Sequence, residues 1–62
     1  MIKEVTNKDI GRWVEYTPKN EKGRIKSIGE NVVFVVYNCD EDWDNYRNYT
    51  GACTRIEDLE YI

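Results

Sequence analysis

Aromatic residues, together with arginine, lysine and asparagine, are the residues of this sequence whose chemistry suits a ligand. Flat rings stack on a nucleobase, guanidinium groups bind phosphate, and amide groups bond to the edges of a base or a ribose. A nucleotide site needs this set, but Trp, Tyr and Arg are also the usual hot spots of protein interfaces. The candidate ligand-binding residues are Arg12, Trp13, Tyr16, Arg24, Lys26, Trp43, Tyr46, Arg47, Asn48 and Tyr49.

The chain has more aromatic rings than a small core can enclose. Its 62 residues include two tryptophans, five tyrosines and one phenylalanine. Some of these rings are therefore expected to line a ligand site or an interface, or to be divided between the core and a contact between protomers with no small ligand. A domain this short is marginally stable alone, so we also expect a homo-oligomer.

Catalytic and metal-binding groups are scarce. The chain has no histidine and no serine besides Ser27, so the usual pairs of nucleophile and base cannot be assembled, and we expect no enzyme activity, no catalytic residues and no cofactor. Residues 40–44 resemble the start of a calcium loop. Asn45 and Gly51 stand where that loop needs glycine and a bidentate glutamate, so no metal site is predicted.

The overall charge limits the partners and the location that we expect. A net charge of -3 and a pI near 4.8 make duplex nucleic acid an unfavourable partner. The N-terminal residues lack the apolar segment of a signal peptide, and no stretch approaches the ~18 apolar residues that span a membrane. We therefore expect a cytoplasmic protein without a membrane partner, in which Cys39 and Cys53 are reduced.

Alternating side chains predict two strands in the first half of the chain. Residues 12–17 form the first, and residues 24–28 form the second, with a kink near Ser27. Residues 18–23 are polar and are closed by Gly23, which predicts a hairpin loop longer than the tightest kind. The side chains expected to face the core are Val14, Tyr16, Ile25 and Ile28.

Residues 32–37 carry the strongest strand signal. They are β-branched or aromatic throughout and lie between turn-forming residues, which predicts the central strand. Residues 38–48 are polar and predict a loop that can include one helical turn around residues 42–46. Small side chains over residues 49–54 predict a fourth strand, in which Cys53 is expected to be a core residue.

The end of the chain predicts a helical turn followed by a short strand. Thr54 and Glu57 have the spacing of a capping box, which predicts a turn starting at Thr54 and running through residue 58. Residues 60–62 then form the last strand. This layout predicts an all-β fold, a small SH3-like five-stranded barrel with one short helical turn before the last strand, in a single domain over residues 1–62.

Several motifs of the chain occur together in one group of viral proteins. They are Ile10-Gly11-Arg12-Trp13-Val14-Glu15-Tyr16, Lys22-Gly23-Arg24-Ile25, Val33-Phe34-Val35-Val36-Tyr37-Asn38-Cys39, Asp42-Trp43-Asp44-Asn45-Tyr46, Asn48-Tyr49-Thr50-Gly51-Ala52 and Asp58-Leu59-Glu60. By these motifs the chain resembles the small SH3-like β-barrel proteins of unknown function that tailed phages and prophages encode. The resemblance covers nearly the whole chain.

The resemblance implies a phage protein acting in the cytoplasm of the host cell. Several unrelated families of tiny phage proteins bind the nucleotide signals of bacterial antiviral systems, and this chain is similar to them in size and expected self-association. We therefore expect an oligomeric anti-defence protein that sequesters a host nucleotide immune signal of the cyclic dinucleotide or ADP-ribose type. The alternative is an SH3-like adaptor that binds a host or phage protein through an aromatic patch.

Overall fold

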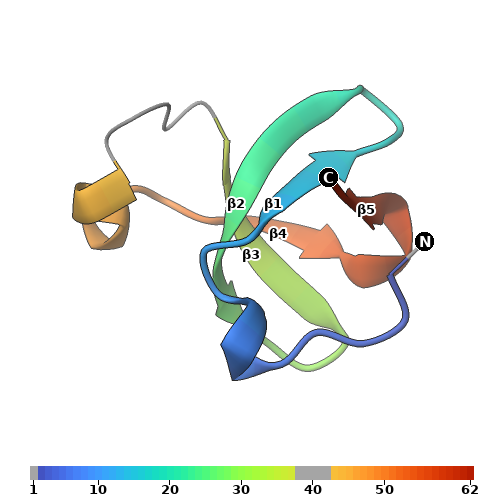
Figure 1. Ribbon diagram of the computed structural model, residues 1–62, viewed down its shortest axis with the longest axis horizontal. Coiled ribbons are helices and arrows are strands. Elements are labelled where there is room, and N and C mark those ends of the chain that lie inside the picture. The colour runs from blue at the N-terminus through green and yellow to red at the C-terminus, as the bar shows by residue number, and fades with distance from the viewer. Residues whose placement is uncertain (1, 38–42) are drawn as a thin grey trace.

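The computed structural model describes residues 2–37 and 43–62, without the side chains of Trp43 and Tyr46. Strands and short 3-10 turns make up its regular structure (Figure 1). No helix in the described ranges is long and apolar enough to cross a membrane. In chain order the elements are η1 (Asn7–Asp9), β1 (Trp13–Tyr16), β2 (Glu21–Ile28), β3 (Val32–Tyr37), η2 (Trp43–Asn48), β4 (Ala52–Arg55), η3 (Ile56–Asp58) and β5 (Leu59–Tyr61).

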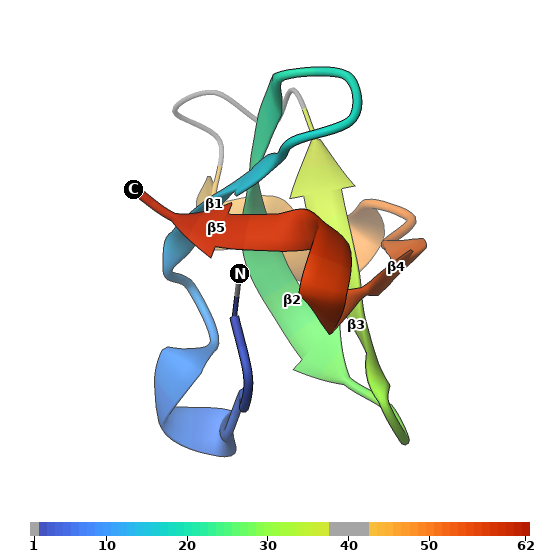
Figure 2. The same ribbon diagram turned by 90° about the vertical axis from the view of Figure 1, so that its right-hand side faces the viewer.

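The five strands form one antiparallel sheet in the order β4-β3-β2-β1-β5. This confirms the predicted all-β fold and the short helical turn before the last strand. The prediction that residues 32–37 form the central strand is wrong. Strand β3 has a neighbour on each side, but β2 occupies the middle of the sheet because β5 returns to pair with β1. Figure 2 shows η3 leading from β4 to β5, which lies at the opposite edge of the sheet.

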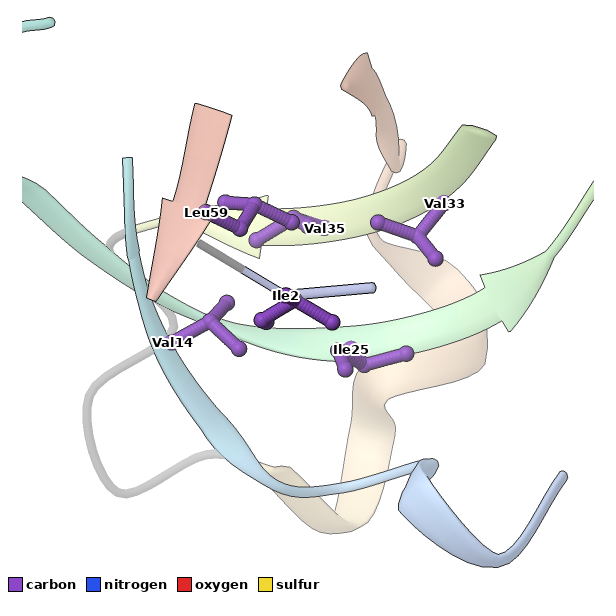
Figure 3. Packing of buried hydrophobic residues seen from close by; sticks show 6 residues of the cluster. All are labelled: Ile2, Val14, Ile25, Val33, Val35 and Leu59. Atoms are coloured by element: carbon purple, nitrogen blue, oxygen red, sulfur yellow. The ribbon is translucent and has the colours of Figure 1, made fainter. Parts of the chain in front are cut away.

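Aliphatic side chains from four strands and the N-terminal segment form the core (Figure 3). Ile2 lies among the strand residues, and its amide donates to the Leu59 carbonyl at 3.1 Å. The prediction that four side chains of β1 and β2 face the core is confirmed. Val14 and Ile25 are fully buried, and Tyr16 and Ile28 are partly buried and pack against the core. The buried members of this cluster are Ile2, Val14, Ile25, Val33, Val35 and Leu59.

Strand β2 is longer than predicted because it begins within the expected loop. The turn between β1 and β2 is short, and Asn20 takes the left-handed conformation there with a φ of 54°. Gly23 does not close a loop; it is buried inside β2, opposite Val14 and Tyr37. The expected kink is confirmed as a shift of register between Ile25 and Ser27, which leaves Lys26 as the bulged residue.

The C-terminal half departs from prediction at β4. This strand covers Ala52–Arg55 rather than residues 49–54, and Cys53 is exposed instead of being a core residue. The predicted capping box is wrong, because Thr54 lies within β4 and its hydroxyl donates to the Ala52 carbonyl at 3.1 Å. The expected helical turn around residues 42–46 is present as two 3-10 turns that meet at Asn45, within η2.

The capping box of this chain is found at η1 instead. The Thr6 hydroxyl accepts from the Lys8 amide, and the Asp9 carboxylate accepts from the Thr6 amide at 2.9 Å. The spacing of Thr6 and Asp9 contains an aspartate where the capping-box pattern has glutamate or glutamine. The turn-forming composition of this segment was therefore visible in the sequence, but its helical geometry was not.

Candidate ligand-binding surface

No aromatic side chain in the described part of the chain is buried. The fully buried side chains are all aliphatic, whereas the described rings are exposed or half-buried. The described rings are Trp13, Tyr16, Phe34, Tyr37, Tyr49 and Tyr61. Tyr16, Tyr37 and Tyr61 pack against the core, so the expectation that some rings lie outside the core is confirmed for the exposed Trp13 ring.

One row of side chains crosses the outer face of the sheet. Trp13 pairs with Arg24, and Arg24 pairs with Val36 in β3. On the other side of β1, the Ile62 amide donates to the Trp13 carbonyl at 3.3 Å, which continues the row past the end of β5. Residues paired across strands point to the same face of a sheet, so these four side chains are neighbours. We call Ile62, Trp13, Arg24 and Val36 the outer row.

The outer row has an exposed apolar end and a covered end. Trp13 is 40% exposed and Ile62 is 59% exposed, whereas Val36 is 1% exposed although strand alternation turns it away from the core. Figures 1 and 2 place η2 on this side of β2 and β3, beyond the outer face of the sheet. The accessible part of the row is therefore the part formed by Ile62, Trp13 and Arg24.

Arg24 is fixed beside the Trp13 ring. Its Nε donates to the Gly11 carbonyl at 2.8 Å, and its Cζ lies 5.4 Å from the centre of the indole ring. Gly11 has a φ of 94°, a conformation that glycine adopts without strain, which places this carbonyl toward β2. A guanidinium at this distance is attracted by the ring quadrupole, so the pair is held in one arrangement.

Lys26 ties the segment after η2 to the same face of the sheet. Its ammonium donates to the Tyr49 carbonyl at 2.5 Å. A Cβ on Gly51 would lie 2.8 Å from the Phe34 Cβ and 3.4 Å from the Lys26 Cδ, so the chain approaches β3 closely there. Arg47 and Asn48 are exposed just before this attachment point. The structure therefore brings Lys26 and this segment next to Arg24.

Arg12 lies apart from the outer row. Its Cζ is 3.6 Å from the centre of the Tyr61 ring, and its Nη1 is 3.2 Å from the Asp9 carboxylate. Arg12 immediately precedes β1, and neighbouring residues in an extended chain point in opposite directions, so Arg12 and Trp13 point toward different faces of the sheet. The Tyr61 hydroxyl is shielded from solvent and lies close to the Asp9 carboxylate. Burial raises the pKa of this phenol.

The pKa of the Asp9 carboxyl lies below its usual value of 3.8, first because the Thr6 amide donates to the carboxylate, and also because the Arg12 guanidinium is close. A carboxyl with a lowered pKa in the folded state stabilises the fold above its unfolded pKa, and this contribution is lost as the pH falls through the folded pKa. We expect Arg12→Gln to raise the pKa of Asp9 only part of the way, since the Thr6 amide remains. Carbon-detected NMR titration of the carboxyl measures this. A pKa that does not change, or that returns fully to its usual value, would contradict this assignment.

Tyr16 points to the inner side of the sheet, away from Trp13. Its ring meets the Tyr37 ring edge to face, with centroids 6.4 Å apart. Trp43 and Tyr46 are also candidate residues, but their side chains lie outside the described part of the structure. Of the candidate residues, the structure thus brings together Trp13, Arg24, Lys26 and the segment with Arg47, Asn48 and Tyr49, and it separates Arg12 and Tyr16 from them.

Sequence reasoning missed three residues around these positions. Ile62 extends the outer row, and Tyr61 and Asp9 hold Arg12. Ile62 and Tyr61 depend on the pairing of β5 with β1, which joins segments about as far apart as the chain allows, whereas Asp9 contacts Arg12 locally, three residues away. The alternation of residues 60–62 indicated a strand but carried no signal for its partner.

Comparisons with known proteins give no relative for this chain. No family model, no curated protein and no solved structure matches it. In the described residues, no three acidic or cysteine side chains gather as metal ligands would. Residues 40–42 of the calcium-like run fall outside the described ranges. The chemistry of this surface therefore has to be argued from its own geometry.

Proposed function

We propose that this chain is a non-enzymatic, oligomeric, SH3-like binding protein that sequesters a nucleotide of the cyclic dinucleotide or ADP-ribose type on the accessible part of the outer row. The observation that carries this proposal is the pair of Trp13 and Arg24, in which an exposed indole is held beside a fixed guanidinium. Trp13 is not among the rings that pack against the core, so this indole is not needed to fill the interior.

In this proposal the Trp13 indole stacks on the base. Stacking of a base on an aromatic side chain contributes about 1–3 kcal/mol and tolerates different bases, because every base has a π face. Arg24 attracts the phosphates next to the stacked base through its charge, and Lys26 lies two residues farther along β2. Arg47 and Asn48 are exposed on the segment that Lys26 attaches to the sheet through the Tyr49 carbonyl.

The strand order supports an SH3-like barrel. Strand β5 lies beside β1, the two edge strands β4 and β5 are joined by a 3-10 turn, and the bulge at Lys26 bends the middle strand. These are the features by which a five-stranded sheet coils upon itself. The small aliphatic core supports self-association, since a domain with so little buried surface gains stability from a partner copy.

The composition supports binding without catalysis. With no histidine and only Ser27 as a serine, the chain lacks the pairs of nucleophile and base on which acyl and phosphoryl hydrolysis depend. The resemblance to small phage proteins supports the biological direction, which is sequestration of a host immune signal in the host cytoplasm. A protein of this kind works by affinity and by its copy number, and it requires no turnover.

Calorimetric titration with cyclic dinucleotides and ADP-ribose derivatives tests the proposal. We expect binding tighter than millimolar to at least one of them. Trp13→Leu keeps an apolar side chain but removes the ring, and it should weaken that binding roughly tenfold or more because base stacking is lost. Lys3→Gln is the matched control, since it removes an exposed positive charge far from the outer row, and it should leave the affinity nearly unchanged.

Two results would remove this proposal. One is the absence of binding tighter than millimolar to every nucleotide tested. The other is binding that Trp13→Leu leaves unaltered, because the ring would then have no part in it. Sedimentation of the free and ligand-bound chain gives the oligomeric state, and a monomer under both conditions would contradict the oligomeric part alone.

A protein partner is the second candidate, and one observation favours it. The large apolar side chains exposed in the described part of the chain are Ile10, Trp13 and Ile62, and the last two are neighbours in the outer row. An exposed tryptophan beside an isoleucine and an arginine is a common centre for a protein interface. Capture of one defined host or phage protein that is lost with Trp13→Leu, together with no nucleotide binding, would favour this adaptor function.

A further inference from the structure

A hollow of about 500 Å³ follows the free edge of β4. Every residue of Ala52–Arg55 lines it. Consecutive side chains of a strand point to opposite faces, so a hollow touched by all the residues of a strand lies along its edge and not on one of its faces. Among the described strands β4 pairs only with β3. Its other edge therefore faces this hollow with main-chain N–H and C=O groups.

The opposite wall of the hollow comes from the β1–β2 hairpin. Tyr16 ends β1, Lys19 lies in the turn and Glu21 begins β2, while Asp58 of η3 also borders the hollow. The hollow thus lies between the free edge of β4, the β1–β2 hairpin and η3.

The inner lining is aromatic and held in place. The Tyr16 and Tyr37 rings meet at an interplanar angle of 65°. The Thr54 hydroxyl uses its one proton to donate to the Ala52 carbonyl, so the Tyr37 hydroxyl, 3.1 Å from the Thr54 oxygen, must be the donor between these two groups. Phenol rings fixed in this way offer an apolar surface with little mobility.

The charges around the hollow do not select an ion. Lys19 and Glu21 lie on the hairpin side, and Arg55 already contacts Glu57 at 3.2 Å and Asp58 at 3.5 Å on the β4 side. Positive and negative groups of similar number favour a ligand without large net charge. Main-chain amides, which carry dipoles rather than charges, satisfy this condition and also match the hydrogen-bonding edge of β4.

We propose that the hollow binds one extended peptide segment of another protein, paired main chain to main chain with β4. A second copy of this chain does not fit the geometry as well. In a second copy, β4 is paired with β3. If that β4 entered the hollow, the attached β3 would be placed against Lys19 and Glu21 of the first copy. A single extended segment has no such neighbour and fills the space between both walls. This site is separate from the outer row and independent of nucleotide binding.

Hydrogen exchange on the intact chain tests the proposal, with a mixed-sequence library of blocked heptapeptides as the probe. We expect the library to slow exchange by roughly tenfold at those amides of Ala52–Arg55 that point away from β3, because edge amides that become paired lose access to water. Amides of β5, the other edge strand, provide the internal control and should not change. The same library N-methylated at every residue cannot donate a main-chain hydrogen bond to β4 from either edge and should give no protection.

Alkylation of Cys53 gives a second, independent measurement. This thiol is exposed on β4 and lines the hollow. We expect the unmethylated library to slow its reaction with iodoacetamide, read by peptide mass mapping so that Cys39 is scored separately. The proposal is overturned by unchanged exchange and alkylation at millimolar peptide, by equal protection from the N-methylated library, or by protection of β4 that grows with protein concentration in the absence of peptide, which would identify a second copy as the occupant.

Discussion

Replacing Gly23 with alanine is expected to lower the free energy of unfolding by about 3 kcal/mol. A Cβ at this position would lie 2.7 Å from both the Val35 Cγ1 and the Val36 carbonyl oxygen, and 2.9 Å from the Tyr37 Cδ1. The carbonyl belongs to the paired strand β3 and cannot move away without breaking the sheet. A domain of this length has a total stability of roughly 3–9 kcal/mol, so this one methyl group should remove a large part of it.

Gly29→Ala is the matched control for this prediction. A Cβ at Gly29 would meet the Val32 Cγ2 at 3.0 Å and the Phe34 Cε2 at 3.3 Å, and both are ends of side chains that can shift. Its cost should therefore be clearly smaller than that of Gly23→Ala. Urea denaturation of both variants measures the difference. If the two variants lose the same free energy, or if Gly23→Ala unfolds like the parent chain, the close approach of β2 and β3 described here is wrong.

Leu59→Ala is expected to cost about 2–5 kcal/mol, the range for deleting a fully buried leucine side chain. Leu59 has no exposed surface, begins β5 and pairs with Tyr16 of β1, and its carbonyl accepts the Ile2 amide. Its loss should loosen both the last strand and the N-terminal segment. Exchange of the β5 amides should therefore accelerate more than exchange in the middle of β2.

Ile62→Ala provides the comparison at the end of the same strand. Ile62 is also aliphatic, but it is 59% exposed, so its truncation should change the free energy of unfolding by less than about 0.5 kcal/mol. Chemical denaturation of the two variants under the same conditions separates a core position from an outer-row position. Equal losses would contradict the assignment of Leu59 to the core and Ile62 to the surface.

The sequence predicted the elements whose side chains repeat locally. Val14 and Ile25 were placed correctly in the core because strand alternation depends only on neighbouring residues. The kink near Ser27 was also correct, since it follows from two isoleucines that must both face inward across an odd spacing. Residues 32–37 were predicted as the central strand because their apolar run is the strongest in the chain. Such a run indicates a strand with a neighbour on each side, but it does not fix the order of the strands in the sheet.

The parts that could not be predicted depend on contacts between distant segments. Gly23 looks like a turn residue in the sequence, and only the carbonyl of Val36 and the side chains of β3 show that a close approach requires it. Thr54 satisfied the capping-box pattern but lies in β4, since pairing with Val33 outweighs a local capping preference. The candidate site was predicted in composition but only partly in arrangement. Alternation placed Tyr16 on the core side, but the contact of Arg12 with Tyr61 and the position of Ile62 beside Trp13 follow from the pairing of β5 with β1.

Intermolecular nuclear Overhauser effects between a bound nucleotide and the chain test the central claim most directly. With the tightest-binding cyclic dinucleotide or ADP-ribose derivative, stacking on the outer row predicts contacts from base protons to the Trp13 indole protons and to the Ile62 methyl groups beside them. Contacts confined to other residues, with none to Trp13, would contradict the proposed site even if the nucleotide binds tightly.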